Sequence, residues 1–382
     1  MRIALIRQRY NPFGGAERFI ERAMNALERE GTEVTVVTRY WKSENGRRAL
    51  VVDPPFAGRL WRDVSFSRGV RAALAGGAFD LVQSHERIPG YDIYRAGDGV
   101  HRQWLDNRLK HASAVERLGV RLNPYHKYVC AAERAMFEHP GLRAVICNSR
   151  MVAEEISRGF PETAGKVHVI YNGVDLAFFH PDHRITMRDD ARAQIGCHDG
   201  ETVFSFVGSG FSRKGLGIAI DALAAANDPK LKLVVAGRDH AKSKFVERAR
   251  RCGVDNQVIF LGGLQDVRPV YAASDCFLLP TRYDPFPNAA LEALAMGVPI
   301  IVSTKCGAAE LVESGVNGWV CEPHGVAALT ATMIKASAAI GGGFQASARR
   351  TAEAFGIEQM AGQMISLYRS LARQPIGERV GH

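Results

Sequence analysis

The chain has 382 residues, of which 46% are apolar and 23% charged, and its formal net charge is +9. This length can supply two domains with separate cores, and the composition is that of a folded globular protein rather than a disordered one. No apolar run approaches the roughly 20 residues that span a bilayer, and the opening MRIALIRQRY is too short an apolar stretch for a secretory signal, so we expect a cytoplasmic protein. The positive charge fits either an anionic partner or a solvated surface.

The first half of the chain alternates between predicted strands and helices. Residues 3–6 (IALI) predict a buried strand, residues 11–17 (NPFGGAE) a Gly-rich turn, and residues 17–31 an amphipathic helix. The apolar runs that predict further strands lie at residues 33–38, 80–85, 92–97 and 144–149. Such alternation predicts a parallel sheet with helices on both faces.

A second series of the same kind follows the polar, proline-bearing segment 171–190. Its predicted strands are residues 202–209, 231–238, 257–263 and 276–281, and its predicted helices are residues 214–226, 243–253 and 267–275. We therefore predict an α/β protein made of two doubly wound, Rossmann-like domains with a cleft between them. Ligands of such sheets bind beyond the carboxyl ends of the strands.

The seven cysteines are scattered, and none forms a CxxC pair. Most stand in apolar surroundings such as AVICNS and SDCFLL, which favours buried free thiols over a metal site or disulfides. No metal is expected.

Residues 278–303 (LLPTRYDPFPNAALEALAMGVPIIVS) predict a strand, a turn, a helix and a second strand. Asn288 is placed to cap the helix, and Gly297 fits the position after its end. An open helix N-terminus attracts phosphate, and carboxylates before and within the helix, Asp284 and Glu292, suit the hydroxyls of a sugar. The alternative is that Asp284 is a turn residue and Glu292 a surface charge.

The segment VGSGFSRKG (207–215) leaves a strand through Gly208 and leads to Arg213 and Lys214. Cations beside open backbone N–H groups can neutralise a departing diphosphate, although a tight turn with two solvated cations would look the same. The segment lacks P-loop spacing, which disfavours nucleoside triphosphate hydrolysis.

Two other turns are weaker candidates. Gly14 and Gly15 open the first predicted helix, where the backbone can approach a ligand or simply turn. Asp98 and His101 follow a strand end, where either could contact a substrate hydroxyl, or Asp98 could cap a helix.

The sequence resembles the retaining glycosyltransferases of family 4, which have the GT-B fold. The resemblance runs in order through NPFGGAER, YNGVD, VGSGFSRKG, DPFPNAALEALAMGVPIIVS, CGAAELVESGVNGWV and FGIEQMAGQMISLYRSL. NPFGGAER, PGYDIYRAGDG and GSGFSRKG are most similar to the lipopolysaccharide core glucosyltransferase subfamily. The resemblance implies an acceptor-binding domain at 1–175, a nucleotide-sugar domain at 176–355 and a C-terminal helix, 356–374, that returns to the first domain.

The resemblance also implies residue roles. Arg213, Lys214, Asp284 and Asp98 would be catalytic, with the two cations on the leaving nucleoside diphosphate and Asp284 on the donor sugar. Glu292 would hold the ribose. The remaining donor-binding residues implied are Gly14, Gly15, Asn172, Gly208, Phe286, Pro287 and Asn288. Asp284 stands where the family has the first glutamate of its E-x7-E motif, and Asp98 where the family often has a histidine.

The reaction implied is transfer of a hexose from a nucleotide sugar, with retention at the anomeric carbon and without a metal or other cofactor. By the subfamily likeness the donor would be a UDP-hexose such as UDP-glucose, and the acceptor a lipopolysaccharide core or another lipid-linked glycan. The alternatives are GDP-mannose or another donor in exopolysaccharide synthesis, a GT-B epimerase or phosphorylase, and a non-catalytic nucleotide-sugar binder. A nucleic-acid partner is not expected, because no such binding module is present.

Residues 101–128 hold six Lys or Arg and three His against two acids, interleaved with aromatic and leucine residues. Such a segment can rest on an anionic membrane surface, or it can be a packed helix pair with a solvated basic face. The residues assigned to acceptor or membrane contact are His101, Arg102, Trp104, Arg108 and Lys110. A peripheral location on the inner face of the cytoplasmic membrane follows from this interpretation.

Overall fold

The computed structural model describes residues 1–8, 24–41, 49–77, 79–109 and 113–373. The chain divides into two compact units, with residues 1–171 and 358–382 in the first unit and residues 172–357 in the second. Each unit is built on one sheet, and every strand pairing within the described residues is parallel.

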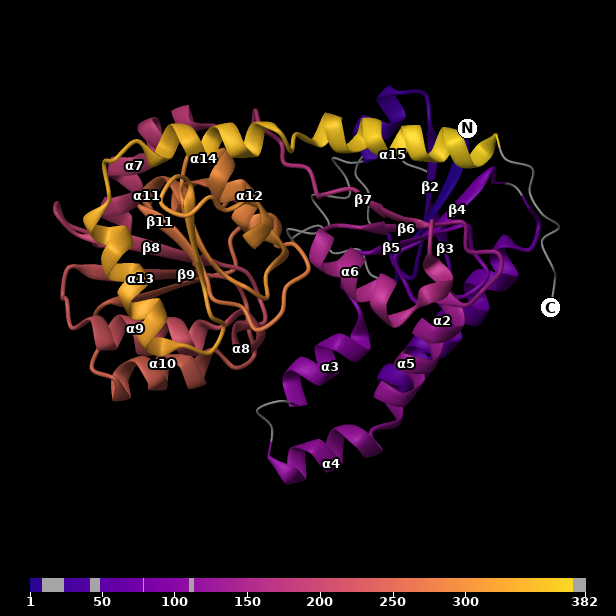
Figure 1. Cartoon of the computed structure of the whole chain (residues 1–382), viewed down its shortest axis with the longest axis horizontal. Helices are drawn as coiled ribbons and strands as arrows, with labels where there is room; N and C mark the ends of the chain where they lie inside the picture. Colours follow the sequence, from indigo (N-terminus) through magenta and orange to yellow (C-terminus); the bar gives the residue numbers. More distant parts are fainter. Residues whose placement is uncertain (9–23, 42–48, 78, 110–112, 374–382) are drawn as a thin grey trace. The chain divides into compact units, whose positions relative to one another are not determined.

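The sheet of the first unit has seven strands in the order β3-β2-β1-β4-β5-β6-β7 (Figure 1). Their bounds are β1 Arg2–Ile6, β2 Glu33–Thr38, β3 Ala49–Val51, β4 Leu81–Ser84, β5 Ile93–Ala96, β6 Ala144–Cys147 and β7 Val167–Val169. The helices of this unit are α2 Gly58–Leu74, α3 His101–Leu109, α4 Ala114–Leu122, α5 Pro124–Phe137, α6 Arg150–Gly159 and, from its second residue on, α15 Ile357–Ala372. The strand order reverses between β1 and β4, as in a doubly wound dinucleotide-binding fold.

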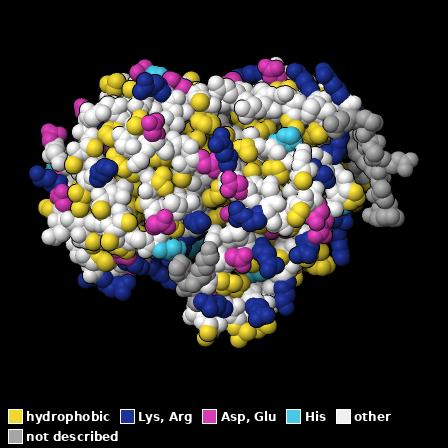
Figure 2. Space-filling model, viewed as in Figure 1, with side chains coloured by type: hydrophobic (Ala, Val, Ile, Leu, Met, Phe, Trp, Pro, Cys, Tyr) yellow, Lys and Arg dark blue, Asp and Glu magenta, His cyan; other side chains and the backbone are white. Residues whose placement is uncertain are grey.

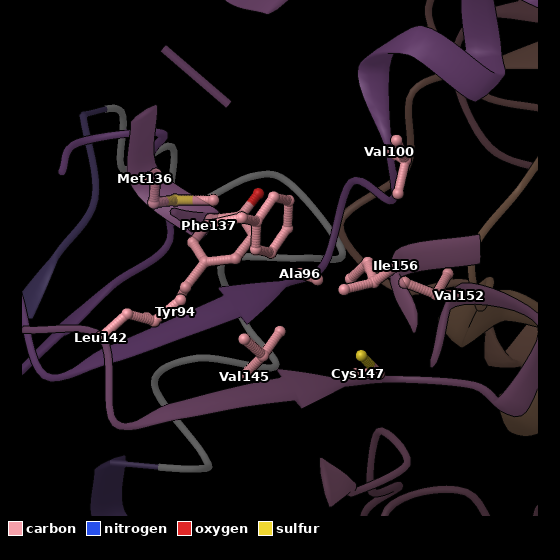
Figure 3. Close-up of a cluster of buried hydrophobic side chains, with 10 residues drawn as sticks. All are labelled: Tyr94, Ala96, Val100, Met136, Phe137, Leu142, Val145, Cys147, Val152 and Ile156. Atoms are coloured by element: carbon pink, nitrogen blue, oxygen red, sulfur yellow. The ribbon is translucent and has the colours of Figure 1, made fainter. Parts of the chain in front are cut away.

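The core of the first unit forms where helices cover the central strands. Figure 3 shows Tyr94 of β5 and Val145 of β6 beside side chains of α5 and α6, and all ten labelled residues are buried. Strands β4, β5 and β6 are buried along their whole length, as expected for a parallel sheet.

Helix α15 packs on the sheet of the first unit although it lies at the far end of the sequence. The Tyr368 hydroxyl donates a hydrogen bond of 2.7 Å to the Gln83 side-chain oxygen in β4. The Arg95 guanidinium of β5 lies 3.5 Å from the Met364 sulfur. Helix α15 thus completes a core that includes the buried residues of β1, which begin at Ile3.

The second unit has six strands in the order β10-β9-β8-β11-β12-β13, which is the same winding. Their bounds are β8 Thr202–Val207, β9 Leu231–Ala236, β10 Val258–Gly262, β11 Cys276–Leu279, β12 Ile300–Ser303 and β13 Gly318–Cys321. The helices are α7 Pro181–Gln194, α8 Phe211–Lys214, α9 Leu216–Ala226, α10 Lys242–Arg251, α11 Arg268–Ala273, α12 Asn288–Ala295, α13 Val326–Ala338 and α14 Phe344–Glu353. The predicted fold class, two parallel Rossmann-like α/β domains, is confirmed.

One predicted helix differs from the observed elements. Residues 214–226 were expected to form a single helix, but Gly215 takes a left-handed conformation (φ 86°) and separates α8 from α9. The apolar spacing of the segment hides this break, because Leu216 to Ala226 keeps its helical pattern regardless of how the preceding turn is arranged.

Candidate functional site

The candidate site in the second unit lies where β8 and β11 end side by side. These two strands flank the point at which the strand order reverses, and they pair in parallel with Phe277 opposite Ser205. The segments that follow them, 208–215 and 280–287, therefore start from the same edge of the sheet. This edge is where doubly wound sheets bind their ligands.

The turn after β8 depends on close backbone approach. Gly208 has φ 140°, and a Cβ there would lie 2.8 Å from the Lys214 Cε. A Cβ on Gly215 would lie 2.0 Å from the Pro280 carbonyl oxygen, which is far inside contact distance. The two glycines thus let the 208–215 segment fold tightly against the segment that follows β11.

Phe211 and Asp239 fix the short helix α8. The Phe211 ring packs edge-on against Phe206 and Phe245 in the core. Its backbone N–H donates a 2.7 Å hydrogen bond to the Asp239 carboxylate. Because the helix is anchored at its first residue, the directions in which the Arg213 and Lys214 side chains extend from it are fixed.

Asp284 gathers the two cations of α8. Its Oδ2 accepts hydrogen bonds from Lys214 Nζ at 2.8 Å and from an Arg213 guanidinium nitrogen at 3.1 Å. The side chains of Asp284 and Lys214 are 9% and 11% exposed, whereas that of Arg213 is 40% exposed. Arg213 also donates to the Tyr283 carbonyl at 2.9 Å.

The charge balance of this cluster favours an anion. Burial alone would raise the pKa of Asp284, but the charges of Lys214 and Arg213 and their hydrogen bonds lower it below its ordinary value. Asp284 is therefore ionised at neutral pH and compensates one of two positive charges. One charge remains uncompensated within the cluster, and Arg213 is its more accessible carrier.

The turn into α12 is held by an amide pair rather than by a side-chain cap. The sequence predicted Asn288 as the capping residue, but the prediction is wrong: the helix starts at Asn288 itself, and Pro287 occupies the capping position without a side-chain cap. Asn288 Oδ1 instead accepts a 2.8 Å hydrogen bond from Asn172 Nδ2, which also lies 3.4 Å from the Phe286 carbonyl. Asn172 thus ties together the turn that carries three of the predicted donor-binding residues.

Glu292 lies one turn inside α12 and is half-buried. Its carboxylate accepts a 2.9 Å hydrogen bond from the hydroxyl of Tyr271 in α11, and the same hydroxyl lies 3.1 Å from the Ala289 carbonyl. Glu292 is therefore oriented by a neighbouring helix and is not a free surface charge. Sequence reasoning missed Tyr271, since a tyrosine in VRPVYAASD carries no spacing signal.

Asp98 lies in the first unit, exposed, in the turn after β5. It does not cap α3. Glu133 of α5, which is 1% exposed, accepts from the His101 N–H at 2.8 Å and pairs with Arg87 at 2.9 Å. Glu133 and Arg87 were not predicted, because their pairing depends on how α5 packs.

Of the residues assigned to acceptor or membrane contact, His101 and Trp104 of α3 form a ring cluster with His126 of α5. His101 Nε2 lies 3.1 Å from His126 Nδ1, and its ring stacks on Trp104 with 5.4 Å between centroids. Burial, followed by the charges of Arg87 and His126, lowers the pKa of His101 to about 4. Arg108 lies over the Trp104 ring and pairs with Glu116, while the Arg102 side chain is exposed. Gly14, Gly15 and Lys110 lie outside the described residues.

The described residues hold neither a metal-binding cluster nor a membrane-spanning helix. Across residues 1–8, 24–41, 49–77, 79–109 and 113–373, no three His, Cys, Asp or Glu side chains are grouped as a metal site would need. Within the same ranges, no helix has the length and apolar character required to cross a membrane.

Two family models match the chain in succession. Residues 13–178 match the model described as Glycosyltransferase Family 4, and residues 187–339 match the model described as Glycosyl transferases group 1. Together the two models cover most of the first and most of the second unit, in which the candidate residues lie.

Individual relatives agree with this assignment. The lipopolysaccharide glucosyltransferase WaaG of Escherichia coli K12 is 25% identical over 348 residues, which are 88% of this chain and 89% of the relative. A D-inositol 3-phosphate glycosyltransferase of Mycobacterium sp. strain KMS is 28% identical, over 82% of this chain and 75% of the relative.

Solved structures show the same fold. The crystal structure of WaaG, a glycosyltransferase involved in lipopolysaccharide biosynthesis, matches with a TM-score of 0.82 at 23% identity, over 96% of this chain and 99% of that one. Anabaena Alr3699/HepE in complex with UDP-glucose matches with a TM-score of 0.72 at 21% identity, over 97% and 100%. The chain is therefore a glycosyltransferase with the GT-B fold, and it resembles the lipopolysaccharide core glucosyltransferase group.

Proposed function

We propose that the protein transfers a hexose from a UDP-sugar, UDP-glucose or a close analogue, to a lipopolysaccharide core or another lipid-linked glycan, with retention at the anomeric carbon. The observation that carries this proposal is the Lys214–Asp284–Arg213 cluster, which has one uncompensated positive charge at the ligand-binding edge of the sheet. A glucosyltransferase relative and a related fold solved with UDP-glucose support the choice of donor.

The cluster would act on the leaving diphosphate. As the bond between the anomeric carbon and the phosphate oxygen breaks, negative charge grows on the diphosphate, and fixed cations stabilise it. Lys214 is held in place by Asp284, while the half-exposed Arg213 can reach an incoming ligand. In the proposed reaction the acceptor oxygen bonds to the anomeric carbon, its proton passes to the departing phosphate oxygen, and no metal takes part.

The two carboxylates would orient the rest of the donor. In this proposal Asp284 accepts a hydrogen bond from a hydroxyl of the sugar while it stays paired with its two cations. Glu292, which Tyr271 holds in place, accepts hydrogen bonds from the ribose hydroxyls. The N–H groups at the start of α12, where Pro287 provides no side-chain cap, offer further donors to phosphate.

A comparison of donors tests this function. Thermal shifts with UDP-, GDP- and ADP-sugars should be largest for a UDP-hexose, because a ligand that binds only the folded state stabilises it. Turnover with that donor should release UDP and give a product whose anomeric configuration matches the donor, as read by NMR. A larger shift and turnover with GDP-mannose would identify the exopolysaccharide alternative, and binding without turnover of any donor would contradict catalysis.

We further propose that α4 rests on an anionic membrane surface, which would bring the enzyme to a lipid-linked acceptor. Val115, Leu118 and Leu122 of this helix are 81%, 58% and 64% exposed. Arg117 and Arg121 share the helix and are also exposed. Figure 2 shows hydrophobic and Lys or Arg side chains next to one another at the lower end of the view, where Figure 1 places α4. Exposed leucines beside arginines suit the boundary of an anionic bilayer.

Vesicle pelleting tests the membrane contact. The variant L118S/L122S should pellet less with anionic vesicles than the wild type, and so should R117E/R121E. The control I185S/V246S removes exposed apolar side chains from α7 and α10 and should pellet normally. Unchanged pelleting of both α4 variants would contradict the proposal.

A further inference from the structure

A cavity lies beside α8, within the second unit. Its volume is about 450 Å³, which is in the range of sites for small molecules. It is bounded by the start of α9, by α10 and by the turn at Arg282, and Figure 1 shows α8, α9 and α10 as neighbours. Arg213, Lys214 and Asp284 are not among the described residues that line it, so it is distinct from the donor cluster.

The wall of this cavity is strongly basic. Its charged lining residues are Lys244, Glu247, Arg248, Arg251 and Arg282. Arg248 is neutralised by Asp221, with Nε 2.7 Å from a carboxylate oxygen. Within the described ranges neither Lys244, Arg251 nor Arg282 forms an ion pair with any carboxylate.

The charge that remains indicates the ligand class. Among the described residues, three exposed cations without a carboxylate partner share the lining with a single acid, Glu247, which leaves two positive charges around the cavity. A phosphate monoester carries between about 1.5 and 2 negative charges at neutral pH, so it would balance them. Lysine and arginine are also the usual side-chain donors to phosphate.

Two apolar residues also belong to the lining of the cavity. They are Ile218 and the buried Phe245, and Ser212 lines the cavity with them. Apolar lining residues combined with a few polar and charged groups are typical of small-molecule sites. Such a lining suits the flatter, C–H face of a sugar ring better than a free inorganic ion.

We propose that this cavity binds a small phosphorylated sugar, with its phosphate between Lys244, Arg251 and Arg282 and its ring over Ile218 and Phe245. The site adjoins the donor cluster through one turn, since Ser212 precedes Arg213 and the Arg282 N–H donates a 2.9 Å hydrogen bond to the Arg213 carbonyl. A ligand held in this cavity contacts the same turn that presents Arg213 and Lys214.

Calorimetric titration with glucose 6-phosphate tests the site, with glucose as the baseline. Removing two of the three cations in K244A/R251A should weaken binding by about tenfold or more. The control K242A/R250A removes the same charge from the same helix, at residues outside the cavity lining, and should bind as the wild type does. Equal weakening in both variants would show diffuse attraction to a basic helix and would overturn the proposal, as would the absence of saturable binding.

The same titration in Lys214→Ala separates this site from the donor site. Glucose 6-phosphate should still bind when the donor cluster has lost its buried lysine, and K244A/R251A in that background should weaken it again. Loss of binding in Lys214→Ala alone would place the ligand in the donor cluster and overturn the proposal. The readout is binding, so it does not depend on whether the protein turns over a UDP-sugar.

Discussion

At Asp284 a single buried carboxylate holds two cations that differ in accessibility. Lys214 is almost enclosed, and its ammonium would be costly to leave without a partner. Arg213 is partly open to solvent and retains donors for a ligand. Because of this asymmetry, the lysine serves as the fixed charge of the cluster and the arginine as its adaptable one.

The isosteric change Asp284→Asn should show that the carboxylate stabilises the two cations, because the effect of this change on stability should depend on pH. At neutral pH the variant should be less stable than the wild type by about 2 kcal/mol, since two cations lose their anion. The folded-state pKa of Asp284 is depressed, so its contribution is present above the ordinary carboxyl pKa and is lost as pH falls through the folded value. The stabilities of the two proteins, measured by urea unfolding, should therefore begin to approach each other as pH falls below about 4 and coincide only below the folded-state pKa.

The exposed Asp255→Asn is a matched control and should follow the wild type at every pH. A difference between Asp284→Asn and the wild type that persisted unchanged to pH 2 would contradict an ionised, ion-paired Asp284.

At the scale of the elements, the site is made by two turns that must approach each other. Gly215 separates α8 from α9 and lies against the carbonyl of Pro280, at the start of the segment that carries Asp284. The Arg213 carbonyl in turn accepts hydrogen bonds from the Arg282 N–H and the Thr281 hydroxyl. The two segments are therefore joined by direct contacts between their backbones.

Gly215→Ala should break this contact. The left-handed backbone alone costs about 1–3 kcal/mol for a residue other than glycine, and the overlap with Pro280 adds to it. Gly253→Ala is the matched control: Gly253 has φ 70°, but a Cβ there meets nothing within 4 Å. Urea unfolding should show a clearly larger loss for Gly215→Ala, and equal losses would contradict the close approach.

How far the sequence predicts the site depends on which contacts follow from topology. The proximity of Arg213 and Asp284 can be predicted from the sequence. Both residues follow strands of one parallel sheet, and the carboxyl ends of such strands share an edge. Two other contacts could not be predicted: that of Tyr271 with Glu292, and that of Glu133 in α5 with the start of α3. Both depend on helix packing, which leaves no spacing pattern in the sequence. The role of Asn288 could not be predicted either. Its side-chain oxygen does not cap α12 but accepts a hydrogen bond from Asn172, which lies 116 residues away in the sequence.

The two short strands of the first sheet were not predicted from the sequence, because they too leave only a weak pattern in it. β3 and β7 contain three residues each and lie at the two edges of the sheet, where burial is incomplete and the apolar signal is weak. Strands β4, β5 and β6, which are buried along their whole length, were predicted from their apolar runs.

At the scale of the whole molecule, the chain enters the second unit at Asn172 and leaves it at Ile357, so the first unit is assembled from both ends of the sequence. Tyr368, which is fully buried, is the clearest link between α15 and β4. The stability of the first unit therefore depends on α15.

Tyr368→Ala should destabilise the first unit by about 3–5 kcal/mol, the range for deleting a buried aromatic side chain. Hydrogen exchange should show reduced protection of β4 and β5, with β8 to β13 unaffected. Arg369→Ala, one exposed position further along α15, should leave both sheets protected. Equal loss of protection in the two sheets would contradict their division into separate units.

The most direct test of the central claim concerns the two cations of α8. Release of nucleoside diphosphate from the best donor should be measured for R213A/K214A and for the control K230A/R250A, which removes two exposed cations from the same unit. With folding of both variants verified by circular dichroism, turnover should fall at least about 100-fold for R213A/K214A and remain normal for the control. If R213A/K214A turned over the donor as fast as the control does, these cations would not stabilise the leaving diphosphate, and the proposed role of the cluster would be wrong.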